Sequence, residues 1–427
     1  SLLFLLVMAS VFQAVFSWAA PMMDLIDGIA ARLIASVQAN LPPGALTSLL
    51  TDGVIAGVGS VVIFLPQILI LFAFIILLED SGYMPRAAFT MDRLMRSAGL
   101  SGQSFIPMLS SFACAVPGIL ATRVIPEERD RLATILAAPF MTCSARLPVY
   151  ALLISAFVPQ QTYLGGLLNL QGLVLLGLYL LGIVGGVFTA WLLKRTVLAG
   201  PTPNFLIELP PYRLPNLRSV LIKLLDRGRL FLKRAGTVIF TVAVVIWALA
   251  YFPHPASVGA DFDTRRAQAT SRFAEPELTQ ELSRLDQQEA ATYLEQSLLG
   301  RAGKLVEPVF APLGWDWKVS AAVLASFPAR EVVIAVLGTI YAVGDAESNE
   351  DALVGRLRAA ERSDGTRLFT LPMVVGLLVF YAFCLQCGAT VAVIARETQS
   401  WRWAGGAWLY MTGLGYLGAL LIYQVFG

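Results

Sequence analysis

The stretch QSFIPMLSSFACAVPGILA, residues 103–121, is apolar but interrupted by two prolines, a glycine and three serines. A second apolar stretch, VSAAVLASFPAREVVIAVLGTIY, residues 319–341, carries Pro328 and the charged pair Arg330 and Glu331 near its middle. Proline inside a helix frees backbone polar groups, and lipid cannot hydrogen-bond to them. Both stretches are therefore predicted to be broken or re-entrant helices that pack inside the protein.

The composition around these stretches is that of a membrane protein. Of the 427 residues, 57% are hydrophobic and only 14% are charged, whereas a soluble domain carries about 25% charged residues. The net charge of +2 argues against a nucleic-acid binder. The four cysteines all lie in apolar or Gly/Pro-broken segments and none in a polar loop, which argues against a secreted disulfide framework. Most of the outer surface is expected to face lipid.

We expect an all-α polytopic membrane protein in which residues 1–427 form a single transmembrane transport domain. The chain begins at Ser1 inside an apolar run without the features of a signal peptide, so we interpret it as starting just before a first spanning helix. A spanning helix needs about 20 apolar residues. About seven stretches qualify as plain spans: 1–20, 61–78, 132–157, 165–192, 235–252, 369–395 and 407–426.

The distribution of Lys and Arg predicts the orientation. Segment 194–234 holds nine basic and two acidic residues and is predicted to be a cytoplasmic, amphipathic segment on the anionic inner leaflet. Segment 253–318 holds seven basic and ten acidic residues and is predicted to be a periplasmic insertion. Counting spans from these anchors, the first broken stretch enters from the cytoplasm and the second from outside.

The two broken stretches also resemble each other. A Leu-x-Ser-Phe core occurs in both, at 109–112 and 324–327, and a cysteine follows each core at a spacing that becomes nearly equal once the polar insertion 344–367 is removed. We therefore predict inverted repeats over 53–157 and 319–403. Paired broken segments in halves of opposite topology are the best sequence indication of a transporter's substrate site.

Three cysteines lie beside residues that loosen helices. Cys114 shortly precedes Pro117, Cys143 lies in a Thr-Cys-Ser-Ala-Arg patch, and Cys387 stands between Gln386 and a glycine. A membrane cysteine can be a simple packing residue. Thiolates, however, are ligands for the softer transition metals, so these three residues are candidate ligands along an ion path.

Charges within the apolar stretches form a second group of candidates. Glu331 lies in the second broken stretch, where an ionisable residue is a functional-site hypothesis by default, although an internal ion pair that holds the broken helix is the alternative. Neighbouring residues on a helix do not face each other, so Arg330 and Glu331 are predicted to have separate buried partners. Arg146 is a similar case, while Arg123 and the run 129–131 are predicted to be ordinary interfacial charges.

Catalytic motifs are missing from the sequence. It contains no G-x-x-x-x-G-K-[ST] run for nucleotide binding, and its single histidine, His254, excludes an H-E-x-x-H site. The sequence therefore predicts no enzyme within this chain.

Several motifs, taken in order, resemble the membrane domain of the FeoB ferrous iron transporter family. The similarity is strongest between residues 60 and 160 and returns in the second broken stretch. The matching segments are Gly82–Phe89, Met91–Met95, Ser104–Pro107, Cys114–Pro117, Ala121–Arg123, Arg129–Leu132, Cys143–Tyr150, Pro328–Val333 and Cys387–Thr398. The two broken stretches match what the family calls Gate motifs.

This resemblance implies Fe²⁺ uptake across the bacterial inner membrane, with an N-terminal GTP-binding domain elsewhere in the full protein. GTP would act only through that domain, and small cytoplasmic Feo accessory proteins and a homo-oligomer are implied partners. The family's candidate metal-path cysteines fall on Cys114, Cys143 and Cys387, and its second Gate acid falls on Glu331. The family usually has Asn after the first cysteine, whereas this chain has Ala115.

The resulting interpretation is that the ion passes between the two repeats with transient Cys, Glu, Ser and carbonyl ligands, the serines being Ser111 and Ser326. A Gate-type transporter of another divalent metal, or of an organic solute such as a nucleoside, is the alternative. A membrane anchor for a cytoplasmic domain and an intramembrane hydrolase are weaker alternatives. An anchor would not need a charged, proline-broken segment.

Overall fold

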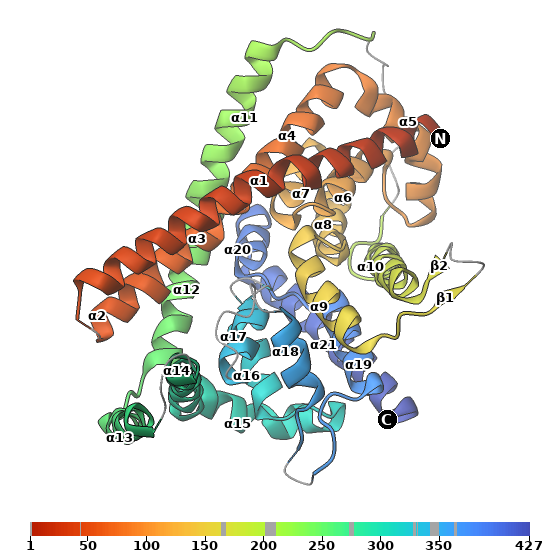
Figure 1. Cartoon of the computed structure of the whole chain (residues 1–427). Helices are drawn as coiled ribbons and strands as arrows, with labels where there is room; N and C mark the ends of the chain where they lie inside the picture. The colour runs from red at the N-terminus through yellow and green to blue at the C-terminus, as the bar shows by residue number, and fades with distance from the viewer. Residues whose placement is uncertain are drawn as a thin grey trace. The chain divides into compact units, whose positions relative to one another are not determined.

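The computed structural model is helical and describes residues 2–42, 44–163, 168–200, 211–272, 277–327, 330, 332–341, 350–362 and 365–427 (Figure 1). Within these ranges the one sheet is a small antiparallel hairpin of β1 (Thr162–Tyr163) and β2 (Leu168–Asn169). The predicted all-α class is confirmed. The chain divides into two compact units, which are described separately.

The first unit comprises residues 1–144, 177–243 and 388–411. Its helices, some of which continue into the second unit, are α1 (Leu2–Asn40), α2 (Ala45–Ser48), α3 (Ala56–Val62), α4 (Leu65–Asp80), α5 (Tyr83–Ser97), α6 (Phe105–Ser111), α7 (Ala115–Ala121), α8 (Glu128–Ala137), α10 (Leu170–Arg195), α11 (Leu217–Phe231), α12 (Thr237–Tyr251), α20 (Gly388–Glu397) and α21 (Trp401–Phe426).

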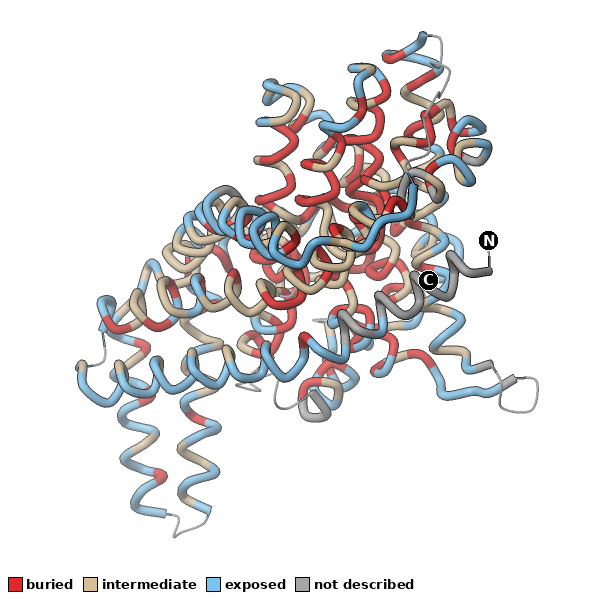
Figure 2. Tube along the Cα trace, turned by 90° about the horizontal axis from the view of Figure 1, so that it is seen from above, coloured by how far each residue is buried: buried red, intermediate tan, exposed pale blue. Residues whose placement is uncertain are grey.

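Helix α1 packs against α4, and beyond residue 16 most of its residues are exposed, as the pale blue part of this helix in Figure 2 shows. The exposed residues include Leu25 and Leu33, which are 66% and 52% accessible. In a membrane, lipid covers exposed apolar side chains such as these. Their exposure therefore agrees with the lipid-facing surface that the composition predicts.

The second unit comprises residues 145–176, 244–387 and 412–427. Its helices are α9 (Leu147–Phe157), α13 (Ala256–Arg272), α14 (Glu277–Gln296), α15 (Leu298–Phe310), α16 (Trp317–Ala325), α17 (Val332–Ile340), α18 (Glu350–Arg358) and α19 (Leu371–Phe383). Prolines at the first or second helical position begin α9 and α19, where the missing N–H has no intrahelical partner to lose.

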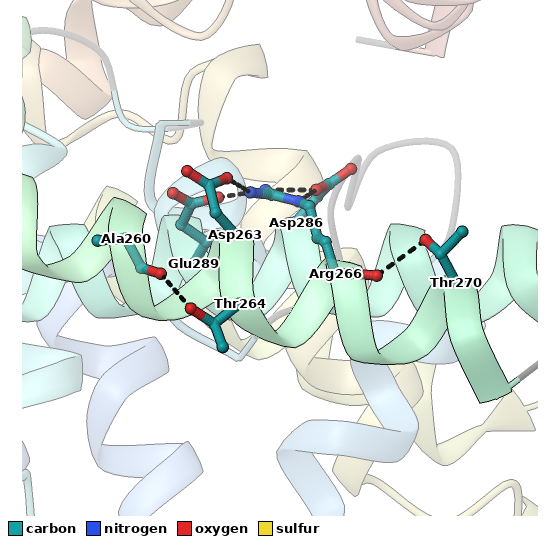
Figure 3. A network of polar contacts seen from close by, with 7 residues as sticks. All are labelled: Ala260, Asp263, Thr264, Arg266, Thr270, Asp286 and Glu289. Atoms are coloured by element: carbon teal, nitrogen blue, oxygen red, sulfur yellow. Dashed lines mark hydrogen bonds and ion pairs between the residues drawn. The ribbon is translucent and has the colours of Figure 1, made fainter.

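Helices α13 and α14 form a polar hairpin within the predicted insertion 253–318. Arg266 of α13 donates to Asp286 of α14 at 2.7 Å and also contacts Glu289 of α14 and Asp263 on its own helix (Figure 3). Below these charges, a small apolar cluster joins the two helices around Phe262 and Leu285. The insertion is helical over α13 and α14, whereas its side of the membrane stays a prediction.

Five helical stretches among the described residues are long and apolar enough to cross a membrane. They are Ala45–Asp80, Glu128–Phe157, Leu170–Arg195, Leu371–Glu397 and Trp401–Phe426. Helices α12 and α13 form a sixth if the 70° bend between them is counted within one span. The predicted spans 61–78, 132–157, 165–192, 369–395 and 407–426 overlap these five stretches, and 235–252 overlaps α12. The predicted span 1–20 falls in the first half of α1, which continues through Pro21 to Asn40.

Candidate functional site

The first broken stretch separates into α6 and α7, with residues 112–114 between them; we call this the first break. Cys114 has extended backbone angles (φ −155°, ψ 133°) and directly precedes α7. Ser111 is fully buried, and its hydroxyl donates to the Pro107 carbonyl at 2.8 Å. The helix break predicted from the prolines is therefore present, and it leaves Cys114 partly accessible.

A glycine allows the two half-helices to fold against each other. A Cβ atom added to Gly118 would lie 1.9 Å from the Ser111 Oγ and 2.8 Å from the Pro107 carbonyl oxygen. Both distances are far below van der Waals contact, and one of the atoms is backbone. No side chain fits at Gly118 without moving α6 away from α7.

We expect Gly118→Ala to destabilise the protein by about 1–3 kcal/mol, the usual effect of overpacking a tight interior. The thermal midpoint in detergent micelles, followed by tryptophan fluorescence, measures this. Gly172→Ala is the matched control, because no atom lies within 4 Å of a Cβ at Gly172 and alanine favours a helix. Equal stability of the two variants would contradict the tight packing of α6 on α7.

A second break lies in the same unit, where the chain leaves its helical turn at residues 141–143. Met141 is extended (ψ 129°), and the helical path resumes at Ser144. The Ser144 hydroxyl donates to the Ala113 carbonyl at 3.1 Å. This hydrogen bond links the second break to the first. Cys143 directly precedes Ser144, and Cys114 directly follows Ala113, so each cysteine is next in sequence to one of the two bonded residues.

The second unit contains a similar arrangement. Helix α16 ends at Ala325 and α17 begins at Val332, and we call the described residues between them, 326, 327 and 330, the third break. Helix α19 ends at Phe383, and the fourth break, residues 384–387, is non-helical. Pro328, Ala329 and the predicted ligand Glu331 lie outside the described residues.

Arg330 hydrogen-bonds to the backbone where α19 ends and the fourth break begins. Its side chain is buried, and its guanidinium donates to the Tyr381 carbonyl at 2.9 Å and the Cys384 carbonyl at 2.7 Å. These are the carbonyls that the end of α19 leaves without helical partners. The buried contacts of Arg330 described here are thus with backbone carbonyls, and no sequence motif indicated which segment would supply them.

Ser326 and Gln386 form a second link between the third and fourth breaks. The Ser326 hydroxyl lies 3.0 Å from Gln386 Oε1, 3.2 Å from the Tyr381 hydroxyl and 2.8 Å from the Val323 carbonyl oxygen. The Gln386 amide donates to that same Val323 carbonyl at 3.1 Å. Cys387, the next residue, is only partly buried, whereas Cys384 is fully buried.

The predicted site residues therefore fall into two groups. Ser111, Cys114 and Cys143 belong to the first and second breaks, and Ser326 and Cys387 to the third and fourth. No group of three or more His, Cys, Asp or Glu side chains that could hold a metal is found in the described part of the chain. The first group has two cysteines and one serine, and the second has one cysteine and one serine, each beside non-helical backbone.

One expectation about charge is wrong. The run 129–131 was expected to be ordinary interfacial charge, yet the Asp130 side chain is inaccessible and forms a 2.6 Å ion pair with Lys194, whose side chain is 5% exposed. The two residues are 64 positions apart, so no local pattern revealed the pair. Arg123 fits the expectation better, with a half-exposed side chain paired to Glu397 at 2.5 Å.

Comparisons with known proteins relate the whole chain to one kind of protein. The family model described as "Gate: Nucleoside recognition" matches residues 61–157 and 232–401, and the model "Ferrous iron transport protein B C terminus" matches residues 175–227. No solved structure matches the chain significantly.

Three relatives illustrate the similarity to curated proteins. The Fe(2+) transporter FeoB of Leptospira interrogans serovar Lai is 41% identical over 99% of this chain and 57% of its own length. The Fe(2+) transport protein A/Fe(2+) transporter FeoB fusion protein of Porphyromonas gingivalis is 40% identical over 99% of this chain and 49% of its own length. The Fe(2+) transporter FeoB of Staphylococcus aureus strain MSSA476 is 36% identical over 99% of this chain and 56% of its own length. The chain spans about half the length of these relatives.

Proposed function

Because this chain belongs to the Gate family and its relatives are FeoB proteins, we propose that it is the membrane part of a ferrous iron importer. The chain is a multi-pass protein of the bacterial inner membrane. Within the proposal, Fe²⁺ is the transported substrate and the repeats 53–157 and 319–403 carry the ion path. The chain itself is proposed to have no catalytic activity.

The observation that carries this proposal is the bond between Ser144 and the Ala113 carbonyl. It brings two unwound segments, each with a partly accessible thiol, into one hydrogen-bonded group. In our proposal Cys114 and Cys143 bind the ion there transiently, with backbone carbonyls completing its coordination. Ala115 stands where the family usually has asparagine, so this position offers no side-chain amide to the ion.

Ser111, Ser326, Glu331 and Cys387 complete the proposed set of transient ligands. An ion path must bind weakly enough to release its ion, so two or three ligands at each point suit it better than a closed cage. Ser111 and Ser326 each keep an oxygen lone pair beside the one hydrogen that they donate. Glu331 adds the negative charge that a dehydrated cation needs.

We expect Cys114→Ser, Cys143→Ser and Cys387→Ser each to lower Fe²⁺ uptake about tenfold, the lower limit seen when residues supporting a metal site are lost. The measurement is uptake of radioactive iron under reducing conditions by cells that produce the intact transporter with its GTP-binding domain. Cys384→Ser is the matched control, because Cys384 is buried and its carbonyl is already bound by Arg330. If all four variants transport at the parent rate, the thiols are packing residues, and the path rests on Glu331, the serines and carbonyls.

A second candidate substrate is an organic solute such as a nucleoside, which the description of the Gate family model favours. Recognition of a nucleoside needs side-chain amides or acids with free hydrogen-bonding capacity. Gln386, the amide at the fourth break, is instead bound at both ends, by Ser326 and the Val323 carbonyl. Uptake of labelled uridine beside that of Fe²⁺, Mn²⁺ and Zn²⁺ distinguishes the candidates.

The partners belong to the proposal as well. The curated relatives are longer than this chain, and one of them is a fusion with Fe(2+) transport protein A. We propose that GTP acts on this chain only through a GTP-binding domain of the same protein, that small Feo proteins bind on the cytoplasmic side, and that the chain forms homo-oligomers.

A further inference from the structure

Helices α4 and α11 of the first unit approach closely and leave a groove beside their contact. A Cβ atom on Gly228 would lie 2.9 Å from Leu69 Cδ2, which shows how near the helices come. The groove has a volume of about 550 Å³. Leucines form both of its walls, Leu65 and Leu69 from α4, and Leu225 and Leu232 from α11 and the π-helical turn that follows it.

Two cations lie on one side of this apolar groove. Arg229 and Lys233 both line it, are four residues apart in a helical segment, and therefore share one face. Both are exposed, and neither forms an ion pair within the described ranges of the chain. Lys223, one turn and a half earlier, is by contrast neutralised by Asp80 at 2.7 Å.

The position of the two cations along the chain places them near a membrane surface. Lys233 comes just before the apolar run 235–252, and Leu65 and Leu69 belong to the candidate span Ala45–Asp80. Basic residues at the end of an apolar run lie at the headgroup level, where each attracts anionic lipid. The groove thus offers an apolar surface and a positive end within one site.

We propose that this groove binds one anionic phospholipid. The lipid phosphate lies between Arg229 and Lys233, and an acyl chain covers the leucines. A free phosphate would satisfy the cations but leave the leucines uncovered. The inference rests on the position of the chain in the membrane and is independent of the ion that it transports.

The test measures lipid preference in the purified chain by native mass spectrometry from mild detergent, with dioleoylphosphatidylglycerol and dioleoylphosphatidylcholine as probes. The parent chain is expected to retain one phosphatidylglycerol in preference to phosphatidylcholine. Because each basic residue contributes about a factor of five at a membrane surface, the double variant Arg229→Gln/Lys233→Gln is expected to lower that preference about thirtyfold. Arg229→Lys keeps the charge and is expected to keep the preference.

Arg227→Gln is the matched control, since Arg227 is an exposed cation on the same helix that does not line the groove. An equal loss in this variant would show general attraction to anionic lipid and overturn the proposed site. Displacement of the bound lipid by millimolar inorganic phosphate, or equal retention of both lipids by the parent chain, would also overturn it. A variant that no longer elutes as a monodisperse peak is replaced by Leu232→Trp, which fills the groove without changing charge and is expected to abolish retention.

Discussion

Lys194→Met is expected to destabilise the protein by about 3–5 kcal/mol, the usual result of removing one partner of a buried ion pair. The Asp130 side chain is inaccessible, and its Oδ1 lies 2.6 Å from Lys194 Nζ. Its second oxygen, Oδ2, has no hydrogen-bond partner among the described residues. Without the lysine, a buried carboxylate keeps no partner for its charge and must be protonated or pull the ends of α8 and α10 apart.

The measurement is the midpoint of thermal unfolding in detergent micelles. Asp130→Asn/Lys194→Met is expected to recover most of the lost stability, because removing both charges of a buried pair is often nearly neutral. Lys223→Met is the matched control: it breaks another Lys–Asp pair of the same unit, but the Lys223 side chain is 48% exposed, and such a pair contributes about 0–1 kcal/mol. A Lys194→Met midpoint equal to that of Lys223→Met would show that Asp130 and Lys194 do not depend on each other.

The prolines made the broken helices predictable from sequence. Pro107, Pro117 and Pro328 remove backbone donors at fixed positions, and lipid offers no replacement, so a break was the physical consequence. The structure places the first break at residues 112–114, between the two prolines of its stretch. The fourth break has no proline, and its only local signal was the Gln-Cys-Gly sequence at residues 386–388.

Long-range pairing was not predictable, because it depends on which helices lie side by side. Asp130 stands between two arginines, and such a run is typical of a solvated helix end. Its partner Lys194 ends an apolar helix, where a lysine normally reaches the lipid headgroups. Only the packing of α8 and α10 in the first unit shows that both side chains are buried together. The same holds for Ser144 and Ala113, whose bond crosses 31 residues.

The first predicted span, 1–20, shows the limit of hydropathy alone. The prediction was restricted to the apolar run, which ends just before Pro21. Helix α1 instead continues through Pro21 to Asn40. Proline removes only its own donor and strains the preceding turn, so a helix that packs against other helices, as α1 does against α4, can pass through it with a local cost.

Arg330→Met is expected to have the second large effect, a destabilisation of about 3–6 kcal/mol. Each of its hydrogen bonds comes from a charged donor and contributes about 1.5–3 kcal/mol. Its loss leaves the carbonyls of Tyr381 and Cys384 without that donor where α19 ends. Methionine fills a similar volume, so the change tests the hydrogen bonds more than the packing.

Arg330→Lys separates charge from geometry. Lysine keeps the positive charge, but its single ammonium group cannot reproduce the two parallel donors of a guanidinium. If Arg330 fixes the shape of the fourth break, both variants will expose Cys387, and its rate of reaction with a maleimide will rise several-fold. Cys143, in the first unit, supplies the internal reference, because the two hydrogen bonds described for Arg330 go to residues 381 and 384.

The two readings of Arg330 give opposite results for these variants. If only its charge matters, for example by balancing a nearby acid, Arg330→Lys will label Cys387 at the parent rate while Arg330→Met alone labels faster. If the two parallel N–H donors of the guanidinium matter, Arg330→Lys and Arg330→Met will raise the labelling rate of Cys387 by the same factor. Unchanged labelling in both variants would mean that the Ser326–Gln386 link holds the fourth break without Arg330. A buried guanidinium that spans two carbonyls is a strong geometric constraint on the residues beside it, so we expect lysine and methionine to give the same increase.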